Sequence, residues 1–252
     1  MTYDRQEKIK KMLAQTGVVY YKDLEAVFPD VSTMTLRRDM AKLECDGLAV
    51  RVRGGARRAA VDGEAREPVY TRRERENVEV KVRIAREALK FLEPERSVFL
   101  DSGTTVMEFA KMMPDMKLNI LTTGPNIAME TITGSNRSVN MVGGAVNSDN
   151  CSVSGAQAMA FIKSVNIDIA FITPSGYSRT GGFTCGNYAE SELKRYIIKK
   201  ANRVILLTAA YKLDKSLPFT FAGLKDADVI ITDAKPDNFM IKKEAKIQII
   251  TV

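Results

Sequence analysis

Hydroxyl and guanidinium groups are concentrated in residues 32–53, at spacings that suit the grip of a polyanion. Apolar side chains recur there at roughly helical spacing (Met34, Leu36, Met40 and Leu43), so that the polar groups fall on the opposite side of the expected helix. Residues 48–53 alternate at strand period with arginine on one face, and a Gly-Gly turn follows. A cationic helix joined to a basic hairpin predicts a winged DNA-binding module. The side chains expected to contact DNA are Ser32, Thr33, Thr35, Arg37, Arg38, Arg51 and Arg53.

A second set of small polar residues and glycines follows four expected strands. The ligand-facing candidates are Asp101, Ser102, Gly103, Thr104 and Thr105 after 98–100; Thr122, Thr123 and Asn126 after 118–121; Gly143 and Gly144 after 139–142; and Lys212 after 204–207. Ligands of parallel α/β sheets bind outside the carboxyl ends of the strands, and hydroxyls beside a helix N-terminus suit a phosphate. Each turn taken singly also fits an ordinary helix cap. Their recurrence at equivalent strand ends predicts a small anionic ligand.

The residues argue against catalysis and metal binding. The chain contains no histidine, which removes the commonest general base and histidine metal ligands, and its three cysteines are too widely spaced for a metal site. The loop 173–178 carries no carboxylate, and the charged side chains at 190, 192 and 194 are expected on a solvated helix face. Asp101 is explained by a capping or ligand-hydroxyl role. We therefore expect no catalytic residue, no metal and no cofactor.

The elements expected to position these residues form two domains that differ in their pattern of helices and strands. Three helical segments with a tight turn before the third, then a hairpin, predict a winged helix-turn-helix over residues 1–58, with an undistinguished three-helix bundle as the alternative. Residues 59–76 are expected to form a linker and the start of a charged helix running from about Thr71 to Leu92. Short apolar runs then alternate with helices, so residues 77–252 are expected to fold as a mostly parallel α/β domain with helices on both faces.

Charge and hydropathy agree with a polyanionic partner. The 252-residue chain has a net charge of +7, and residues 1–60 hold twelve basic residues against eight acidic ones. From Leu48 to Arg58 there are four arginines and no acid, although a merely solvated basic surface would give the same count. No apolar run reaches the ~18 residues needed to span a bilayer and no signal peptide is visible. The expected location is the cytoplasm, with no membrane partner.

These residues resemble the DeoR family of bacterial transcriptional regulators over nearly the whole chain. The first-domain motif stands here as Thr35-Leu36-Arg37-Arg38-Asp39-Met40, Leu43 to Leu48, and Gly54-Gly55-Ala56. The second half resembles the family's sugar-phosphate sensor domain, which is similar in fold to ribose-5-phosphate isomerase. Its matching pieces are Leu100 to Thr105, Gly143-Gly144, Phe171 to Gly176, Gly181-Gly182, Lys194, Lys212 and Thr232-Asp233. The resemblance implies a regulator, most simply a repressor of a carbohydrate-utilisation operon. It would bind double-stranded operator DNA as a homo-oligomer, a dimer or a tetramer, and answer to a phosphorylated sugar.

The chain departs from the family pattern at loops that would face the sugar. Thr122-Thr123 stands where the family usually has Thr-Asn, and residues 173–176 replace Gly-Ala-Asp-Gly. Ala209 and Tyr211 replace an aspartate and a serine. Two alternatives follow: a regulator with a degenerate pocket that answers to another anion or to a protein, and a sugar-phosphate isomerase with an added DNA-binding head.

Overall fold

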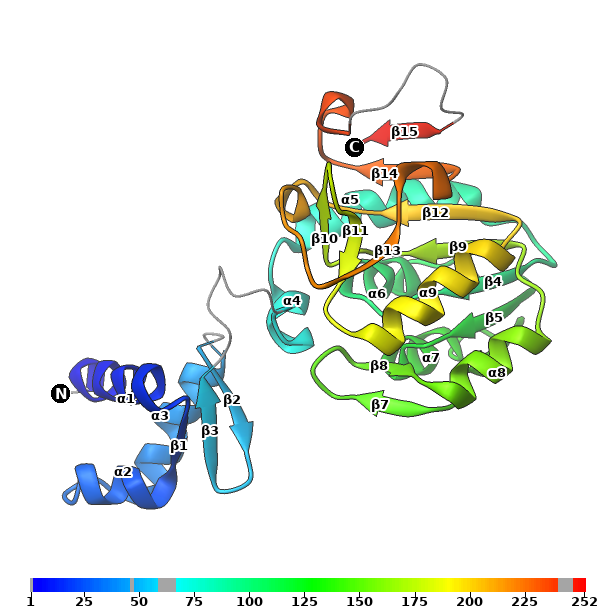
Figure 1. Cartoon of the computed structure of the whole chain (residues 1–252). Coiled ribbons are helices and arrows are strands. Elements are labelled where there is room, and N and C mark those ends of the chain that lie inside the picture. Colours follow the sequence, from blue (N-terminus) through cyan, green and yellow to red (C-terminus); the bar gives the residue numbers. More distant parts are fainter. Residues whose placement is uncertain (1, 46–47, 59–66, 240–246) are drawn as a thin grey trace. The chain divides into compact units, whose positions relative to one another are not determined.

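The computed structural model describes residues 2–45, 48–58, 67–239 and 247–252, and the chain divides into two compact units, Met1–Arg72 and Arg73–Val252 (Figure 1). Each unit has its own hydrophobic core. The predicted linker begins with residues 59–66, which lie outside the described residues, and the domain boundaries set from the sequence stay a prediction. Among the residues described, no helix combines the length and the apolar composition that crossing a bilayer requires.

The smaller unit has the helix and strand order of a winged helix-turn-helix. Its elements are α1 (Thr2–Thr16), β1 (Val18–Tyr20), α2 (Tyr21–Val27), α3 (Thr33–Cys45), β2 (Ala49–Val52) and β3 (Gly55–Arg58). The strands form an antiparallel sheet in the order β1-β3-β2. The first residue of β3 is Gly55. A larger residue does not fit at this position, because its Cβ would overlap the carbonyl oxygen of Val19 on the neighbouring strand. The hairpin β2–β3 is therefore seated closely on β1.

The connecting segment forms two helices, so the single helix predicted from Thr71 to Leu92 is wrong. α4 (Tyr70–Arg75) ends before Asn77, whose φ of 54° lies in the left-handed region, and α5 (Val78–Ala88) then begins. The Lys81 amine of α5 donates to the carbonyl oxygens of Arg73 and Glu76 (2.6 Å for Glu76), which stabilises the break. Val78, the first residue of α5, is 39% exposed.

The larger unit is built on a seven-stranded parallel sheet in the order β15-β14-β12-β9-β4-β5-β6. Its strands are β4 (Ser97–Leu100), β5 (Leu118–Thr122), β6 (Arg137–Met141), β9 (Ile169–Ile172), β12 (Arg203–Leu207), β14 (Val229–Thr232) and β15 (Gln248–Thr251). The chain builds outward from β4 in one direction as far as β6 and then returns to the other side of β4 with β9. The strand order therefore reverses between β4 and β9, and such a switch point is where ligands of these sheets bind.

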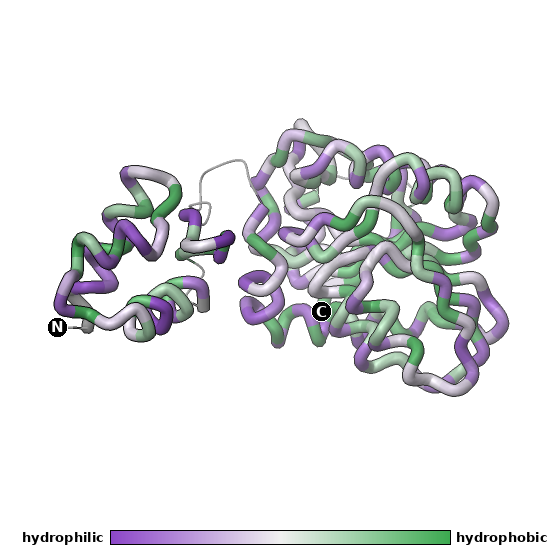
Figure 2. The backbone as a smooth tube through the Cα atoms, turned by 90° about the horizontal axis from the view of Figure 1, so that it is seen from below, coloured by the Kyte–Doolittle hydropathy of each residue, from purple (hydrophilic) through white to green (hydrophobic). Residues whose placement is uncertain are grey.

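Helices cover both faces of this sheet. One core contains α5, α6 (Thr104–Lys111) and α7 (Pro125–Thr131), and the other contains α8 (Ala156–Ser164) and α9 (Tyr188–Lys200). Figure 2 shows the interior of this unit as mainly hydrophobic, while its helices mix hydrophobic and hydrophilic residues. The predicted fold class, a winged helix-turn-helix followed by a mostly parallel α/β sheet with helices on both faces, is confirmed.

Short elements that the sequence did not predict decorate the loops. A hairpin pairs β7 (Ala145–Asn147) with β8 (Ser152–Ser154), and a small antiparallel sheet has the order β10 (Gly176–Ser178), β11 (Gly182–Cys185), β13 (Phe219–Ala222). Among the residues described, single turns of 3-10 helix are found at η1 (Leu89–Phe91), η2 (Ala210–Lys212), η3 (Leu224–Asp226) and η4 (Pro236–Asn238).

Candidate functional site

Helix α3 is held in the smaller unit by one buried face. Leu36, Met40 and Leu43 recur at i, i+4 and i+7 and are fully buried. Asp39 lies beside this row, and its carboxylate accepts hydrogen bonds from Arg5 and from Gln6 Nε2 (2.9 Å for Gln6). Because both donors belong to α1, Asp39 ties α1 to α3 and fixes how the opposite face of α3 is presented.

The opposite face of α3 carries exposed side chains, two of which are arginines. Thr33, Met34, Arg37 and Arg38 are all exposed there. Met34 was predicted to be buried and is 66% exposed, so that prediction is wrong. It precedes Leu36 by two residues, about 200° of helical rotation, and therefore points away from the buried row. The Arg37 guanidinium carbon lies 5.6 Å from the Tyr21 ring centroid, which orients this side chain along α2.

The hydroxyl groups at the start of α3 have partners within the unit. Ser32 Oγ accepts a hydrogen bond from Thr35 N at 3.3 Å, the helix cap predicted for this serine, and lies 3.0 Å from Thr35 Oγ1. Thr33 Oγ1 donates to Glu25 Oε1 at 2.6 Å. These three residues therefore shape the helix start and its junction with α2.

The hairpin places its arginines at the surface. Arg51 on β2 pairs with Glu44 of α3, with 3.0 Å between Nε and Oε2. Arg53 is exposed in the turn between the strands. Within the described part of the chain, no ion pair is found for Arg38 or Arg53. The unit thus offers an exposed cationic helix face and a cationic hairpin, as a winged reader of DNA requires.

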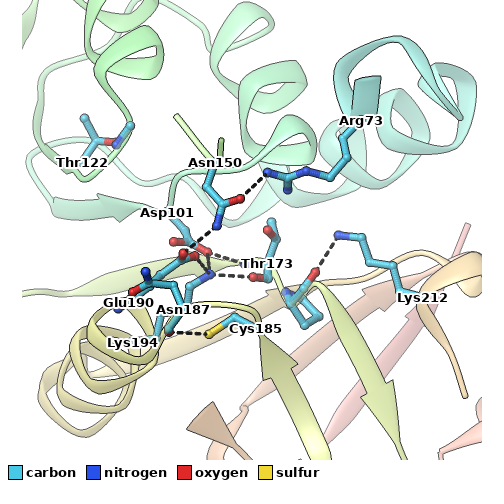
Figure 3. A network of polar contacts seen from close by, with 12 residues as sticks. Arg73, Asp101, Thr122, Asn150, Thr173, Cys185, Asn187, Glu190, Lys194 and Lys212 are labelled. Atoms are coloured by element: carbon cyan, nitrogen blue, oxygen red, sulfur yellow. Dashed lines mark hydrogen bonds and ion pairs between the residues drawn. The ribbon is translucent and has the colours of Figure 1, made fainter. Parts of the chain in front are cut away.

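At the switch point of the larger sheet, a buried ion group joins the end of β4 to α9 (Figure 3). Asp101 follows β4, and its Oδ2 atom accepts from Lys194 Nζ at 2.6 Å and from Thr173 N at 2.9 Å. Lys194 Nζ also donates to the Thr173 carbonyl oxygen at 2.8 Å and lies 3.3 Å from Glu190 Oε1. The ends of the two central strands are therefore fastened together by one carboxylate and one ammonium group.

Lys194 and Glu190 are not on a solvated face, so that part of the prediction is wrong. Lys194 is 3% exposed and Glu190 is 7% exposed, because α9 turns this face onto the sheet. Burial by itself would lower the pKa of Lys194, but the adjacent Asp101 and Glu190 carboxylates outweigh it and raise that pKa above its usual value. The ammonium group stays charged and is committed to holding the site together.

Two hydroxyl groups of the turn after β4 lack partners. Ser102 Oγ and Thr105 Oγ1 are buried and make no hydrogen bond with any residue that the structure describes. Gly103 stands between them as the cap of α6, whose first turn has no side-chain cap, and a Cβ on Gly103 would lie 2.5 Å from Thr173 Oγ1. Buried polar groups are normally satisfied, so these unpartnered hydroxyls beside a helix N-terminus are candidate ligands for an anion.

The remaining predicted ligand residues lie on three further loops. Thr122, Thr123 and Thr104 are buried, Asn126 is half-buried, Lys212 is buried, and Gly143 and Gly144 are exposed between β6 and β7. Lys212 Nζ donates to the Pro174 carbonyl oxygen at 2.7 Å, which brings the loop after β12 to the end of β9. Thr122 Oγ1 accepts from Gly124 N at 3.0 Å and thus supports its own turn, and Thr122 lies apart from the ion group in Figure 3.

Sequence reasoning missed the residues that connect these loops, chiefly Glu190, Thr173 and Asn150. A signal was present for α9: Glu190 and Lys194 share a face with Leu193 and Ile197, at i, i+3, i+4 and i+7. Charged residues on an apolar stripe are expected to be paired and buried. No group of three or more metal-ligating side chains that could hold an ion occurs in the described ranges.

Comparisons with known proteins identify both parts of the chain. A family model described as the DeoR C terminal sensor domain matches residues 76–234, and one described as the DeoR-like helix-turn-helix domain matches residues 5–60. The HTH-type transcriptional regulator GolR of Listeria innocua is 28% identical over 96% of this chain and 94% of its own length. The putative aga operon transcriptional repressor of Escherichia coli O157:H7 is 31% identical over 92% of this chain and 86% of its own length.

Both relatives are named as transcription regulators and neither as an enzyme. The solved ribose 5-phosphate isomerase of Methanocaldococcus jannaschii is similar at 16% identity and a TM-score of 0.41, covering 55% of this chain and 56% of that one.

Proposed function

The chain belongs to the DeoR family of transcriptional regulators, and on that premise we propose that it represses a carbohydrate-utilisation operon until a phosphorylated sugar binds its sensor domain. The named relatives support the first part, since one of them is called a repressor of the aga operon. The unpartnered hydroxyls of Ser102 and Thr105 at the switch point of the sheet carry the second part. The chain acts as a regulator and not as an enzyme.

In the proposed contact with DNA, the arginines of α3 and those of the hairpin have different roles. Arg37 and Arg38 on the exposed face of α3 would contact base edges or phosphates in the major groove, with Met34 beside them. Arg51 and Arg53 would place the hairpin on the sugar-phosphate backbone or in the minor groove. Arg51 exchanges its Glu44 partner for a phosphate on binding, and this costs little because both side chains are exposed. A homo-oligomer, a dimer or a tetramer, would bring two such heads to a repeated operator.

The effector site combines a phosphate end and a sugar end. The first-turn N–H groups of α6, Ser102 Oγ and Thr105 Oγ1 would receive the phosphate, as in other helix N-terminal anion sites. Lys212 would add a positive charge from the loop after β12. The loops at Thr122–Asn126 and Gly143–Gly144 would face the sugar. Asp101 would support the site through Lys194 and Thr173.

The DNA assignment is tested by charge-matched variants. Operator duplexes are selected from a random-sequence pool by the wild-type chain, and their affinities are measured for Arg37→Ala, Arg38→Ala and Arg86→Ala. Each α3 substitution is expected to cost about 1–3 kcal/mol of DNA binding. Arg86→Ala on α5 removes the same charge from an exposed position of the sensor domain and should bind like wild type. Unchanged affinity in both α3 variants would disprove the recognition-helix assignment.

The effector assignment is tested by thermal denaturation against a panel of pentose and hexose phosphates, because a ligand of the native state raises the melting temperature. The double variant Ser102→Ala with Thr105→Val should abolish the shift while keeping the stability, since removing an unpartnered hydroxyl costs little. Ser138→Ala on the exposed surface of β6 is the control. A shift by inorganic anions alone would indicate a degenerate pocket. Turnover of any sugar phosphate would indicate the isomerase.

A further inference from the structure

Asn150 occupies a bridging position between two charged groups of the larger unit (Figure 3). It is 7% exposed and lies in the loop between β7 and β8. Its Oδ1 atom accepts from the Arg73 guanidinium at 3.4 Å, and its Nδ2 atom donates to Glu190 Oε2 at 3.1 Å. The carbonyl end of the amide thus faces a cation and the amino end faces a carboxylate, the one orientation that satisfies both partners.

The loop that carries Asn150 has a fixed geometry. Cys151, the next residue, has φ of 51°, a conformation that side-chain-bearing residues adopt rarely and only where the surroundings enforce it. Asp149 N donates to Asn147 Oδ1 at 3.0 Å, which closes the turn from the other side. Asn150 is therefore held in place by the turn and not only by its own hydrogen bonds.

The β7–β8 hairpin is attached to one of the predicted effector loops. Val142 N donates to the Thr122 carbonyl oxygen and Val153 N to the Thr123 carbonyl oxygen, both at 2.8 Å. Cys151 Sγ lies 3.4 Å from Asn126 Oδ1. A ligand that displaces the Thr122–Asn126 loop would move the hairpin with it.

The two hydrogen-bond partners of Asn150 belong to different parts of the structure. Glu190 forms an ion pair with Lys194, and Lys194 forms another with Asp101, at the other side of the same candidate site. Arg73 belongs to α4, the helix in which the chain passes from the smaller unit to the larger one. Asn150 thus joins the effector loops to the segment that leads to the DNA-binding module.

We propose that the β7–β8 hairpin transmits effector occupancy to α4 through the Asn150 amide. The proposal rests on the proposed function, because it needs a ligand at the Thr122–Asn126 and Ser102–Thr105 loops. According to this proposal, binding of the effector shifts the hairpin, and the contact between Asn150 and Arg73 lengthens or breaks. Helix α4 then becomes more mobile. A ligand that binds the two arrangements with different affinity then changes the DNA affinity.

The test compares Asn150→Ala with Asn140→Ala, an exposed asparagine of β6, in the full chain. Amide hydrogen exchange is followed in peptides covering residues 70–81, without ligand and with the panel member that most raises the wild-type melting temperature. Without ligand, Asn150→Ala should speed exchange in α4 by about ten-fold, the equivalent of one hydrogen bond to a charged group. Asn140→Ala should match wild type.

With the sugar phosphate, Asn150→Ala should keep the rise in melting temperature but lose the ligand-induced change in α4 exchange and in operator affinity. Loss of communication with retained binding is a result that a merely structural role would not produce. Asn150→Ser, too short to span both partners, replaces the alanine variant if that chain does not fold. The proposal would be overturned if the Asn150 variant exchanged at the wild-type rate in α4 without ligand. It would also be overturned if the variant showed the wild-type ligand-induced change in α4 exchange and in operator affinity. If no sugar phosphate binds wild type, the proposed function fails, while the ligand-free exchange still decides whether Asn150 restrains α4.

Discussion

Lys194 holds the loops of the candidate site together, and its own ammonium group is fully engaged by protein atoms. Its ammonium group is engaged by Asp101, Thr173 and Glu190 and is almost fully buried. Burying two carboxylates near one another is unfavourable unless a cation lies between them. Lys194 therefore stabilises the switch point of the sheet, and we expect its substitution to disrupt the structure at this point.

Replacing Lys194 by methionine should destabilise the chain by about 3–5 kcal/mol, because two buried carboxylates lose their counter-ion. Thermal denaturation measures the loss. Lys199→Met, on the exposed side of the same helix, should have little effect, and equal losses in the two variants would refute the pairing.

The turn between β4 and α6 is shaped by the end of β9. Gly103 is the cap of α6, and the Thr173 side chain lies where a Cβ on that glycine would be. Because the neighbouring atom is the hydroxyl of one side chain, the space can be restored by a second substitution. The pair therefore permits a test of whether this turn and the end of β9 are packed against one another.

Gly103→Ala should cost about 1–3 kcal/mol through overpacking. Thr173→Ala in the same chain should return part of that loss, since it removes the hydroxyl and the methyl group and leaves the hydrogen bond from Thr173 N to Asp101 in place. Urea denaturation of the two single variants and the double variant gives the coupling free energy. Additive losses would mean that the close approach does not exist in solution.

The break between α4 and α5 should carry a pH signature. Burial and the nearby Arg73 charge lower the pKa of Lys81 from 10.5 to about 8. Between these values the unfolded chain binds the proton more tightly, so this residue adds stability as the pH rises. The melting temperature of wild type relative to Lys81→Met should accordingly increase from pH 7.5 to 9.5. A constant difference would contradict the burial of this amine, which is 1% exposed.

At the scale of the whole molecule, the sequence predicted the large sheet and missed the connections between its loops. The inner strands of the sheet, such as β9 and β12, are nearly continuous apolar runs, which parallel strands covered on both faces require. Strands such as β7 and β10 have only three residues and mixed polarity, so periodicity could not reveal them. The contact between Asp101 and Lys194 joins residues 93 positions apart, and Asn150 meets Arg73 across 77. Such pairs arise from tertiary packing, which a local pattern does not encode.

The uneven distribution of positive charge predicts a strong effect of salt on DNA binding. Each phosphate contact releases counter-ions, so the logarithm of the affinity should fall linearly with the logarithm of the KCl concentration. Arg38→Ala and Arg53→Ala should each reduce the slope by about one. Arg86→Ala lowers the net charge equally but should leave the slope unchanged. An equal reduction in all three variants would show that overall charge, and not these positions, governs binding.

The all-parallel order of the seven strands has an evolutionary consequence. Each connection between parallel strands returns the chain to the side of the sheet where the strands begin. The last residues of all the strands therefore lie along one common rim, and the apolar side chains that pack the sheet lie away from that rim. Under the proposed function, exchanging a few residues on this rim would alter the effector that is recognised while the apolar core of the sheet is retained. The residues at positions 173–176, 209 and 211, where the chain departs from the family pattern, lie on that rim.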